Sequence, residues 1–342
     1  MRLSVTMRYA GDPKALIERV VGFDRVGVDI LWVAEAYGFD APTLMGYLAA
    51  KTQRMQIGSG ILPIYSRTPA LIAQTAAGLD AVSGGRAILG LGASGPQVIE
   101  GWHGVAYDRP LARTREIIDI CRRIWRRETI VNDGAYPIPL PPEEGTGLGK
   151  PLKILTHPVR DSIPIYVAAL GDKNVRMTAE IADGWLPFLF IPEKADAVWG
   201  EALRAGAAKR SADLAPLEVV AGGPLAIGDD VTPLREAARP MVALYVGGMG
   251  AKGRNFYHDL ACRYGYEAQA NRVQDLFLAG DRAGAAAAVP AEMLELGSLI
   301  GPAGYVRDRI AAYRDAGVTV LNVDPIGPDP ASDLAQVRAW LS

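Results

Sequence analysis

The feature that most constrains the fold of this 342-residue chain is a regular alternation of short apolar runs with amphipathic stretches. Eight runs have the length and composition of buried strands, and helical patterns, several of which open with proline, separate most of them. The strand-like runs are 3–7, 30–34, 55–60, 87–91, 163–169, 184–189, 217–222 and 318–323. The helical patterns are 13–26, 69–82, 111–127, 174–182, 192–209 and 302–316. This alternation predicts an α/β fold of the (β/α)8 or TIM barrel type, with a doubly wound open sheet as the second choice.

Two segments are too long to be simple connections in such a barrel. Residues 129–162 follow the fourth strand and are rich in proline and glycine, so we expect a lid over the barrel mouth. Residues 234–297 follow the seventh strand and predict a helical insertion around the loop 246–255. Because no linker or repeat divides the chain, we expect one domain over residues 1–342.

Composition narrows the classes of partner. A net charge of -2 with 49% hydrophobic residues indicates a globular protein without bulk attraction to nucleic acid. No apolar run reaches 18 residues, so we expect no membrane span, and Cys121 and Cys262 form neither a disulfide framework nor a metal motif. These features fit a cytoplasmic protein that binds a small molecule and no metal.

The segment 86–104, RAILGLGASGPQVIEGWHG, runs from an apolar strand into a glycine-rich turn. Gly90, Gly92 and Gly95 satisfy the dinucleotide pattern G-x-G-x-x-G. That pattern also needs a helix that opens at the glycines and an acidic residue at the end of the next strand. Residues 97–110 show no helical periodicity, and the acids about 20 positions on lie at or inside the next predicted helix. We therefore interpret the turn as a ligand-binding loop of another kind.

The residues that follow the predicted strands should meet at one barrel mouth. They combine one carboxylate with small residues and aromatics, which suits a planar heterocycle held by main-chain groups. They are Glu35, Gly60 and Ile61, Ala93 to Val98, Ala168 to Gly171, and Phe188. Neither a pair of acids for glycoside hydrolysis nor a G-x-S-x-G nucleophile elbow is present. Redox chemistry supplied by an organic cofactor is the simplest interpretation.

Five segments resemble the bacterial-luciferase-like superfamily, and within it the branch of coenzyme F420-dependent oxidoreductases related to methylenetetrahydromethanopterin reductase. The segments are 28–43, 58–80, 84–104, 164–174 and 182–187. The resemblance implies hydride transfer between F420 and an organic substrate, and, by analogy, a homodimer. Two alternatives stay open: an FMN-dependent monooxygenase of the same fold, and a cofactor-binding barrel without turnover.

The resemblance also implies positions for the site. A non-prolyl cis peptide between Gly60 and Ile61 would lie behind the deazaflavin ring, and Glu35 would face the polar edge of the ring. The other cofactor-binding positions are Ser94, Gly95, Gln97 and Val98 near the ring and Ala168, Ala169, Leu170 and Gly171 near the phosphate. Lys252 and Arg254 could meet the anionic tail of the cofactor. His103, with Glu35, is the candidate catalytic residue, because imidazole titrates near neutral pH.

Some positions allow two interpretations or depart from the family. Trp102 could wall the pocket or only pack, and Tyr65, Ser66 and Arg67 could line the pocket or form a surface turn. In the sugar-phosphate-oxidising branch, a histidine follows the acidic residue of the second strand and a glutamate lies in the fourth-strand turn. Ala36 and Ala93 occupy those positions here, so we do not expect a glucose-6-phosphate dehydrogenase.

Overall fold

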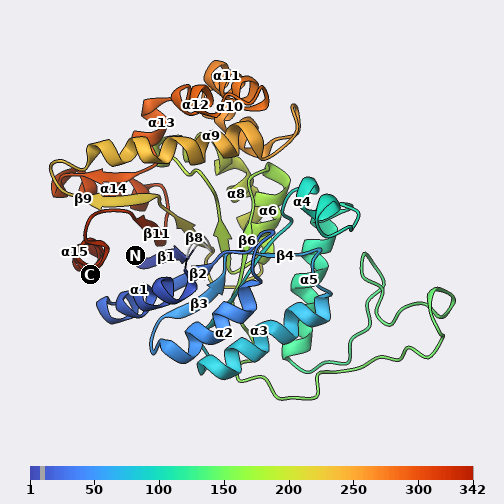
Figure 1. Ribbon diagram of the computed structural model, residues 1–342. Coiled ribbons are helices and arrows are strands. Elements are labelled where there is room, and N and C mark those ends of the chain that lie inside the picture. Colours follow the sequence, from blue (N-terminus) through green and yellow to red (C-terminus); the bar gives the residue numbers. More distant parts are fainter. Residues whose placement is uncertain (8–11, 342) are drawn as a thin grey trace.

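The computed structural model describes residues 1–7 and 12–341, and its centre is a closed barrel of eight parallel strands (Figure 1). Neighbouring strands pair in parallel, and β1 closes the barrel against β11 with Leu3 opposite Leu321. The strands are β1 (Arg2–Met7), β2 (Ile30–Val33), β3 (Gln56–Ser59), β5 (Ala87–Gly92), β6 (Ile165–Ala168), β7 (Gly184–Leu186), β8 (Glu218–Ala221) and β11 (Val320–Pro325). The predicted (β/α)8 barrel is confirmed.

Helices surround the barrel, and their first turns show why they begin where they do. Asp12, Asp40 and Thr68 each precede a helix that carries proline in its first turn, and each side chain accepts a hydrogen bond from a backbone amide there. The helices are α1 (Pro13–Val26), α2 (Ala41–Lys51), α3 (Pro69–Ser83), α5 (Pro110–Trp125), α6 (Asp172–Ile181), α7 (Pro192–Ala195), α8 (Glu201–Ala207), α14 (Ala303–Asp315) and α15 (Pro330–Leu341). A π-helical turn, Asp196–Gly200, joins α7 to α8, so the single helical pattern 192–209 is one interrupted helix.

The core has two layers, as a barrel requires. Inside the strands lies a small cluster of large side chains, in which the rings of Trp32 and Tyr166 pack 5.2 Å apart. The main cluster fills the space between strands and helices. All six residues of β5 are buried, which explains why its sequence is a continuous apolar run rather than an alternating one.

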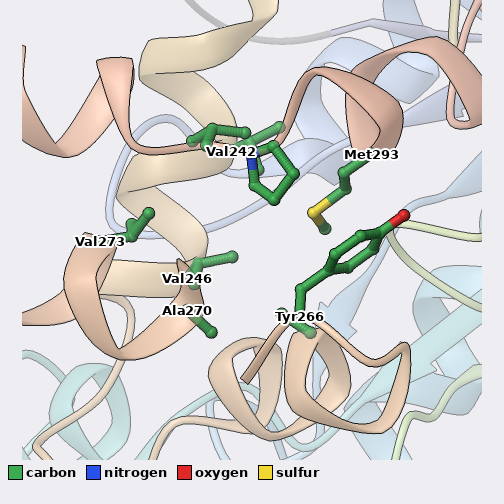
Figure 2. A pocket seen from close by; sticks show the side chains of 9 residues that line it. Val242, Val246, Tyr266, Ala270, Val273 and Met293 are labelled. Carbon is green, nitrogen blue, oxygen red and sulfur yellow. The ribbon is translucent and has the colours of Figure 1, made fainter. Parts of the chain in front are cut away.

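The expected helical insertion covers one side of the barrel (Figure 1). It follows β9 (Pro224–Ile227) and precedes β10 (Leu299–Gly301), two short strands that sequence reasoning missed. It contains a 3-10 helix (Thr232–Ala238), α9 (Arg239–Gly248), α10 (Phe256–Arg263), α11 (Glu267–Leu278), α12 (Arg282–Ala287) and α13 (Ala291–Leu296). Figure 2 shows apolar side chains of α9, α11 and α13 facing one another around a gap of about 10 Å³. A gap of that size is marginal even for one water, so this is packed core and not a ligand site.

Residues 129–162 are arranged differently from the lid we expected. Asn132 and Ile138 form an antiparallel bridge that lies against α5, and a 3-10 turn follows at Pro142–Glu144. Much of the remainder extends away from the barrel beside α5 (Figure 1), and it exposes Leu148 and Leu155. Only the part around Tyr136, whose hydroxyl donates to the carbonyl of Ile64, reaches the mouth.

The expectation that no helix directly follows the fourth predicted strand is wrong. Helix α4 (Pro96–Gly101) begins at the residue after Gly95, and a turn at Trp102 ends it. With six residues it is too short to show a 3.6-residue period, which is why residues 97–110 carry no helical signal. Among the described residues, no helix is long and apolar enough to cross a membrane.

Candidate functional site

The end of β3 is locked to β5 by one serine. The Ser59 hydroxyl donates to the carbonyl of Gly90 over 2.8 Å and accepts from the Gly90 amide over 2.9 Å. A Cβ on Gly90 would lie 1.8 Å from the Ser59 carbonyl oxygen, so only glycine allows this approach. The chain then turns into the mouth through Gly60 and Ile61, which are joined by a cis peptide bond, and continues into β4 (Leu62–Pro63) beside β5.

Ile61 belongs to a small apolar wall at the carboxyl end of the strands. A Cβ on Gly92 would lie 2.9 Å from Cδ1 of Ile61 and 3.4 Å from Cβ of Ala168. Since Gly92 has no side chain, Ile61 and Ala168 approach each other across it. The strand ends of β3, β5 and β6 therefore share one close-packed surface.

The turn after β6 holds its carbonyls in place and leaves helix amides exposed. Trp185 Nε1 donates to the carbonyl of Ala169 over 2.9 Å, and Trp199 Nε1 donates to that of Leu170 over 2.8 Å. Gly171 occupies the N-cap of α6, where it offers no capping side chain. No side chain caps the first amides of α6 at the positive end of the helix dipole, and the carboxylate of Asp172 in the same turn pairs with Arg263.

Glu35 is not a free carboxylate. Its two oxygens accept from both terminal nitrogens of Arg67, over 2.5 and 2.8 Å, and Oε2 also accepts from the amide of Ala41 over 2.7 Å. Both side chains of the ion pair are largely buried. This arrangement ties the loop after β2 to the loop after β4, and its three hydrogen bonds commit most of the acceptor capacity of the Glu35 carboxylate, which weighs against the predicted acid-base role.

The β5 turn brings the other predicted residues to the mouth. Ser94 takes a positive φ of 58°, and its carbonyl accepts from the Tyr107 hydroxyl. Gly95 caps α4, on which Gln97 is exposed and Val98 half-buried. His103 follows α4, and its Nε2 is buried without a hydrogen-bond partner among the described residues. A buried nitrogen without a partner is unusual and is a natural contact for a bound group.

A cleft of about 260 Å³ adjoins this mouth. It is lined by Ile64, Tyr65, Ser66, Arg67, Thr68, Val105, Arg113 and Tyr136. Residues 65 to 67 line this cleft, whose lining includes none of the predicted cofactor-binding residues. Sequence reasoning missed Arg113 and Tyr136, because a lone arginine on a helix and a tyrosine in a loop carry no local signal.

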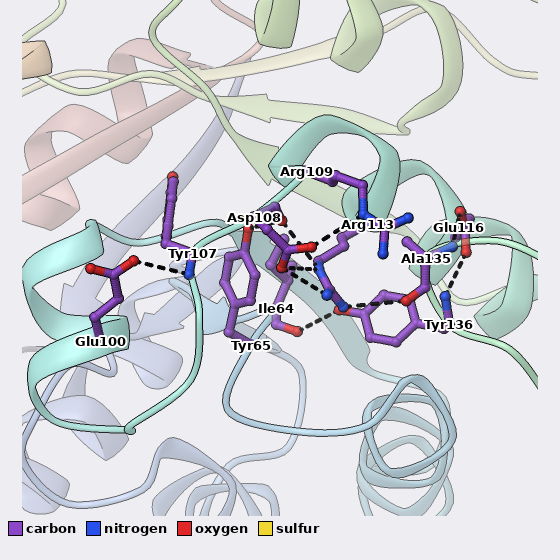
Figure 3. A network of polar contacts seen from close by, with 10 residues as sticks. All are labelled: Ile64, Tyr65, Glu100, Tyr107, Asp108, Arg109, Arg113, Glu116, Ala135 and Tyr136. Atoms are coloured by element: carbon purple, nitrogen blue, oxygen red, sulfur yellow. Dashed lines mark hydrogen bonds and ion pairs between the residues drawn. The ribbon is translucent and has the colours of Figure 1, made fainter. Parts of the chain in front are cut away.

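Figure 3 shows how the outer wall of this cleft is held. Arg113 binds Asp108 over 2.8 Å and lies over the rings of Tyr65 and Tyr136. Hydrogen bonds from Arg109 and Arg113 hold the pKa of Asp108 below its usual range. Burial raises the pKa of Tyr65, so its hydroxyl stays protonated and donates to the carbonyl of Asp108. The wall is a satisfied network that gives the cleft a fixed shape.

The two predicted tail-binding cations lie in the loop after α9. Lys252 is exposed and already pairs with Asp275 over 2.6 Å, whereas Arg254 forms a backbone bridge with Ala251. The last turn of α9 reaches the second residue after β7, since the rings of Tyr245 and Phe188 lie 4.4 Å apart. The loop is therefore adjacent to the mouth. Within residues 1–7 and 12–341, no cluster of His, Cys, Asp or Glu could hold a metal ion.

Comparison with known proteins places this fold and site in a family. The family model described as luciferase-like monooxygenase matches residues 1–320. The chain belongs to this luciferase-like family.

Individual relatives are similar over nearly the whole chain. A Mycobacterium tuberculosis protein, whose name assigns it provisionally to the coenzyme F420-dependent oxidoreductases, is 40% identical over 98% of both chains. The 5,10-methylenetetrahydromethanopterin reductase of Archaeoglobus fulgidus is 32% identical over 89% of this chain and 87% of its own. The coenzyme F420-dependent tetrahydromethanopterin reductase of Methanopyrus kandleri superposes with a TM-score of 0.80 at 24% identity, covering 98% of this chain and 96% of its own, which supports the fold.

Proposed function

We propose that the protein is a coenzyme F420-dependent oxidoreductase. When bound, F420 accepts or supplies a hydride for an organic substrate. The observation that carries the proposal is the continuous surface from Ile61 across Gly92 and Ala168 to the uncapped amides of α6, which combines an apolar wall with an anion site. The names of the most similar relatives support the same cofactor.

Each part of this surface suits one part of the cofactor. The apolar wall at Ile61 suits a flat ring, and the amides after Gly171 suit a phosphate. Ser94, Gly95, Gln97 and Val98 lie on the turn after β5 and on α4, where they would contact the ring. Lys252 and Arg254 could reach an extended anionic tail, and Lys252 would then exchange Asp275 for the tail.

We infer different roles for the two candidate catalytic residues. His103 presents a buried ring nitrogen without a partner, so it can hold or deliver a proton at Nε2. Glu35 has its oxygens occupied, so it acts as a positioning residue that fixes Arg67 at the edge of the cleft.

Titration of the purified protein with F420 and, separately, with FMN tests the cofactor. We expect F420 binding, followed by its fluorescence, and much weaker FMN binding. Tight binding of FMN without binding of F420 would favour the monooxygenase alternative. Binding of F420 without redox change over a broad substrate panel would favour a binding protein.

The position of His103 can be tested without a substrate. In ¹⁵N NMR spectra of the histidine side chains, F420 should shift the Nε2 signal of His103, whereas His157 serves as a control because it pairs with Arg127 in the segment beyond α5. Equal shifts for the two residues, or none, would remove His103 from the site.

A further inference from the structure

Two aromatic side chains stand at the open side of the candidate site. Tyr37 lies in the loop after β2 and Trp102 in the turn after α4, and their ring centroids are 6.4 Å apart. Although the rings contact each other, 61% of Tyr37 and 66% of Trp102 remain exposed. Large apolar side chains that remain so exposed, and that meet from two different loops, are typical of a binding surface.

The surroundings connect this aromatic pair to the chemistry of the site. Tyr37 is two residues from Glu35, whose carboxylate is committed to Arg67. Trp102 directly precedes His103, whose Nε2 is buried without a partner among the described residues. The two rings therefore belong to the same loops as the imidazole of His103 and the Glu35–Arg67 ion pair.

The residues near Tyr37 and Trp102 indicate which class of molecule could bind there. Ala36 and Ala93 offer only methyl groups, and the Glu35–Arg67 pair satisfies its own charges. Among the described residues, no lysine or arginine adjoins Tyr37 or Trp102 in sequence, whereas a phosphate that leaves water needs a paired charge. An uncharged flat ring system loses little on leaving water and gains contact with both rings.

We propose that Tyr37 and Trp102 bind the substrate, and that the substrate carries an uncharged, flat, largely apolar ring system. This inference rests on the proposed function for the identity of the site and adds the class of its substrate. The rings bind and orient the substrate body, while His103 lies at its reacting end.

The test uses 2-acetonaphthone, an uncharged bicyclic aryl ketone, with glucose 6-phosphate as the polar comparison. Binding to the full-length protein is measured by saturation-transfer difference NMR, with and without F420. We expect 2-acetonaphthone to bind and glucose 6-phosphate not to bind. Trp102→Ala and Tyr37→Ala should each weaken the binding of 2-acetonaphthone about tenfold, and Trp102→Phe should restore most of it. Tyr47→Ala removes a ring of 51% exposure on α2 and should have no effect.

The outcomes separate this proposal from the proposed function. F420 affinity should be equal in all variants, because the rings lie outside the cofactor wall. If F420 fails to bind the unaltered protein, the proposed function fails, while the titration without F420 still tests the ring pair. The inference is overturned if 2-acetonaphthone does not bind or binds the alanine variants equally well. It is also overturned if Trp102→Ala changes the oligomeric state, because the rings would then cover a second copy of the chain.

Discussion

The two sides of the barrel mouth are built in opposite ways. The inner wall, formed by Ser59, Ile61, Gly90, Gly92 and Ala168, is close-packed, and a Cβ on Gly90 would collide with the backbone of Ser59. The rim, formed by Tyr37, Gln97, Trp102 and the turn at His103, consists of loops and the short helix α4 and carries exposed or unpartnered groups. The contrast suggests that the two sides bind different ligands: the wall binds the cofactor, and the rim binds the substrate.

Gly90→Ala should give the largest effect, because it breaks the inner wall. The new Cβ would meet the Ser59 carbonyl at 1.8 Å, and a backbone atom cannot move aside cheaply. We expect a loss of more than about 3 kcal/mol in the free energy of unfolding, together with loss of F420 binding. Urea unfolding measures the first and fluorescence titration the second.

Gly95→Ala is the matched control, in the turn that follows the same strand. No atom lies within 4 Å of a Cβ there, and the φ of -112° suits alanine. The free energy of unfolding should change by less than about 1 kcal/mol. If both variants lose the same free energy of unfolding, the claim that the inner wall is close-packed at Gly90 is contradicted.

Glu35→Gln should have the next largest effect, because it leaves Arg67 largely buried without its counter-charge. We expect a loss of about 3 kcal/mol in stability. A double-mutant cycle with Arg67→Met checks the reason, since the double variant should be more stable than Glu35→Gln alone. Additive losses would mean that the pair does not couple the two loops.

Glu116 on α5 should have a smaller, pH-dependent effect on how residues 132–138 are attached to the protein. Burial raises the pKa of Glu116. Hydrogen bonds from the amides of Ala135 and Tyr136 and from Asn132 lower it by more, so the net pKa lies below the usual range. A carboxylate with a lowered pKa stabilises the folded state at pH values above the ordinary glutamate pKa of about 4.3. This stabilisation is lost as the pH falls through the lowered pKa. The attachment of residues 132–138 to α5 should therefore loosen below about pH 4.

Hydrogen exchange at the amides of Ala135 and Tyr136 measures this loosening. Their protection should fall roughly tenfold between pH 5 and pH 3. In Glu116→Gln it should be low and independent of pH. Unchanged protection in that variant would show that other contacts hold the segment.

Lys252→Ala should have the smallest effect on stability. Its ion pair with Asp275 is exposed, so the free energy of unfolding should change by less than about 0.5 kcal/mol. A contact with the cofactor tail predicts instead a several-fold loss of F420 affinity that high salt reduces. If the F420 affinity does not change, Lys252 does not contact the cofactor and forms only its surface ion pair with Asp275.

The sequence predicted the features that local periodicity controls. Continuous apolar runs such as β5 identified the strands, and proline in the first turn located helices such as α1 and α3. It could not predict the partner of Glu35, because Arg67 is 32 residues away and only the barrel brings the two together. Helix α4 was too short for a period, and the course of residues 129–162 depends on contacts with α5 that leave no pattern in the segment itself.

A crystal structure of the protein with F420 tests the central claim most directly. The account predicts the deazaflavin ring against Ile61 and Gly92, the phosphate at the amides after Gly171, and Tyr37 and Trp102 still uncovered by the cofactor. A ring bound on Trp102, or a phosphate bound away from α6, would contradict the division between a cofactor wall and a substrate rim.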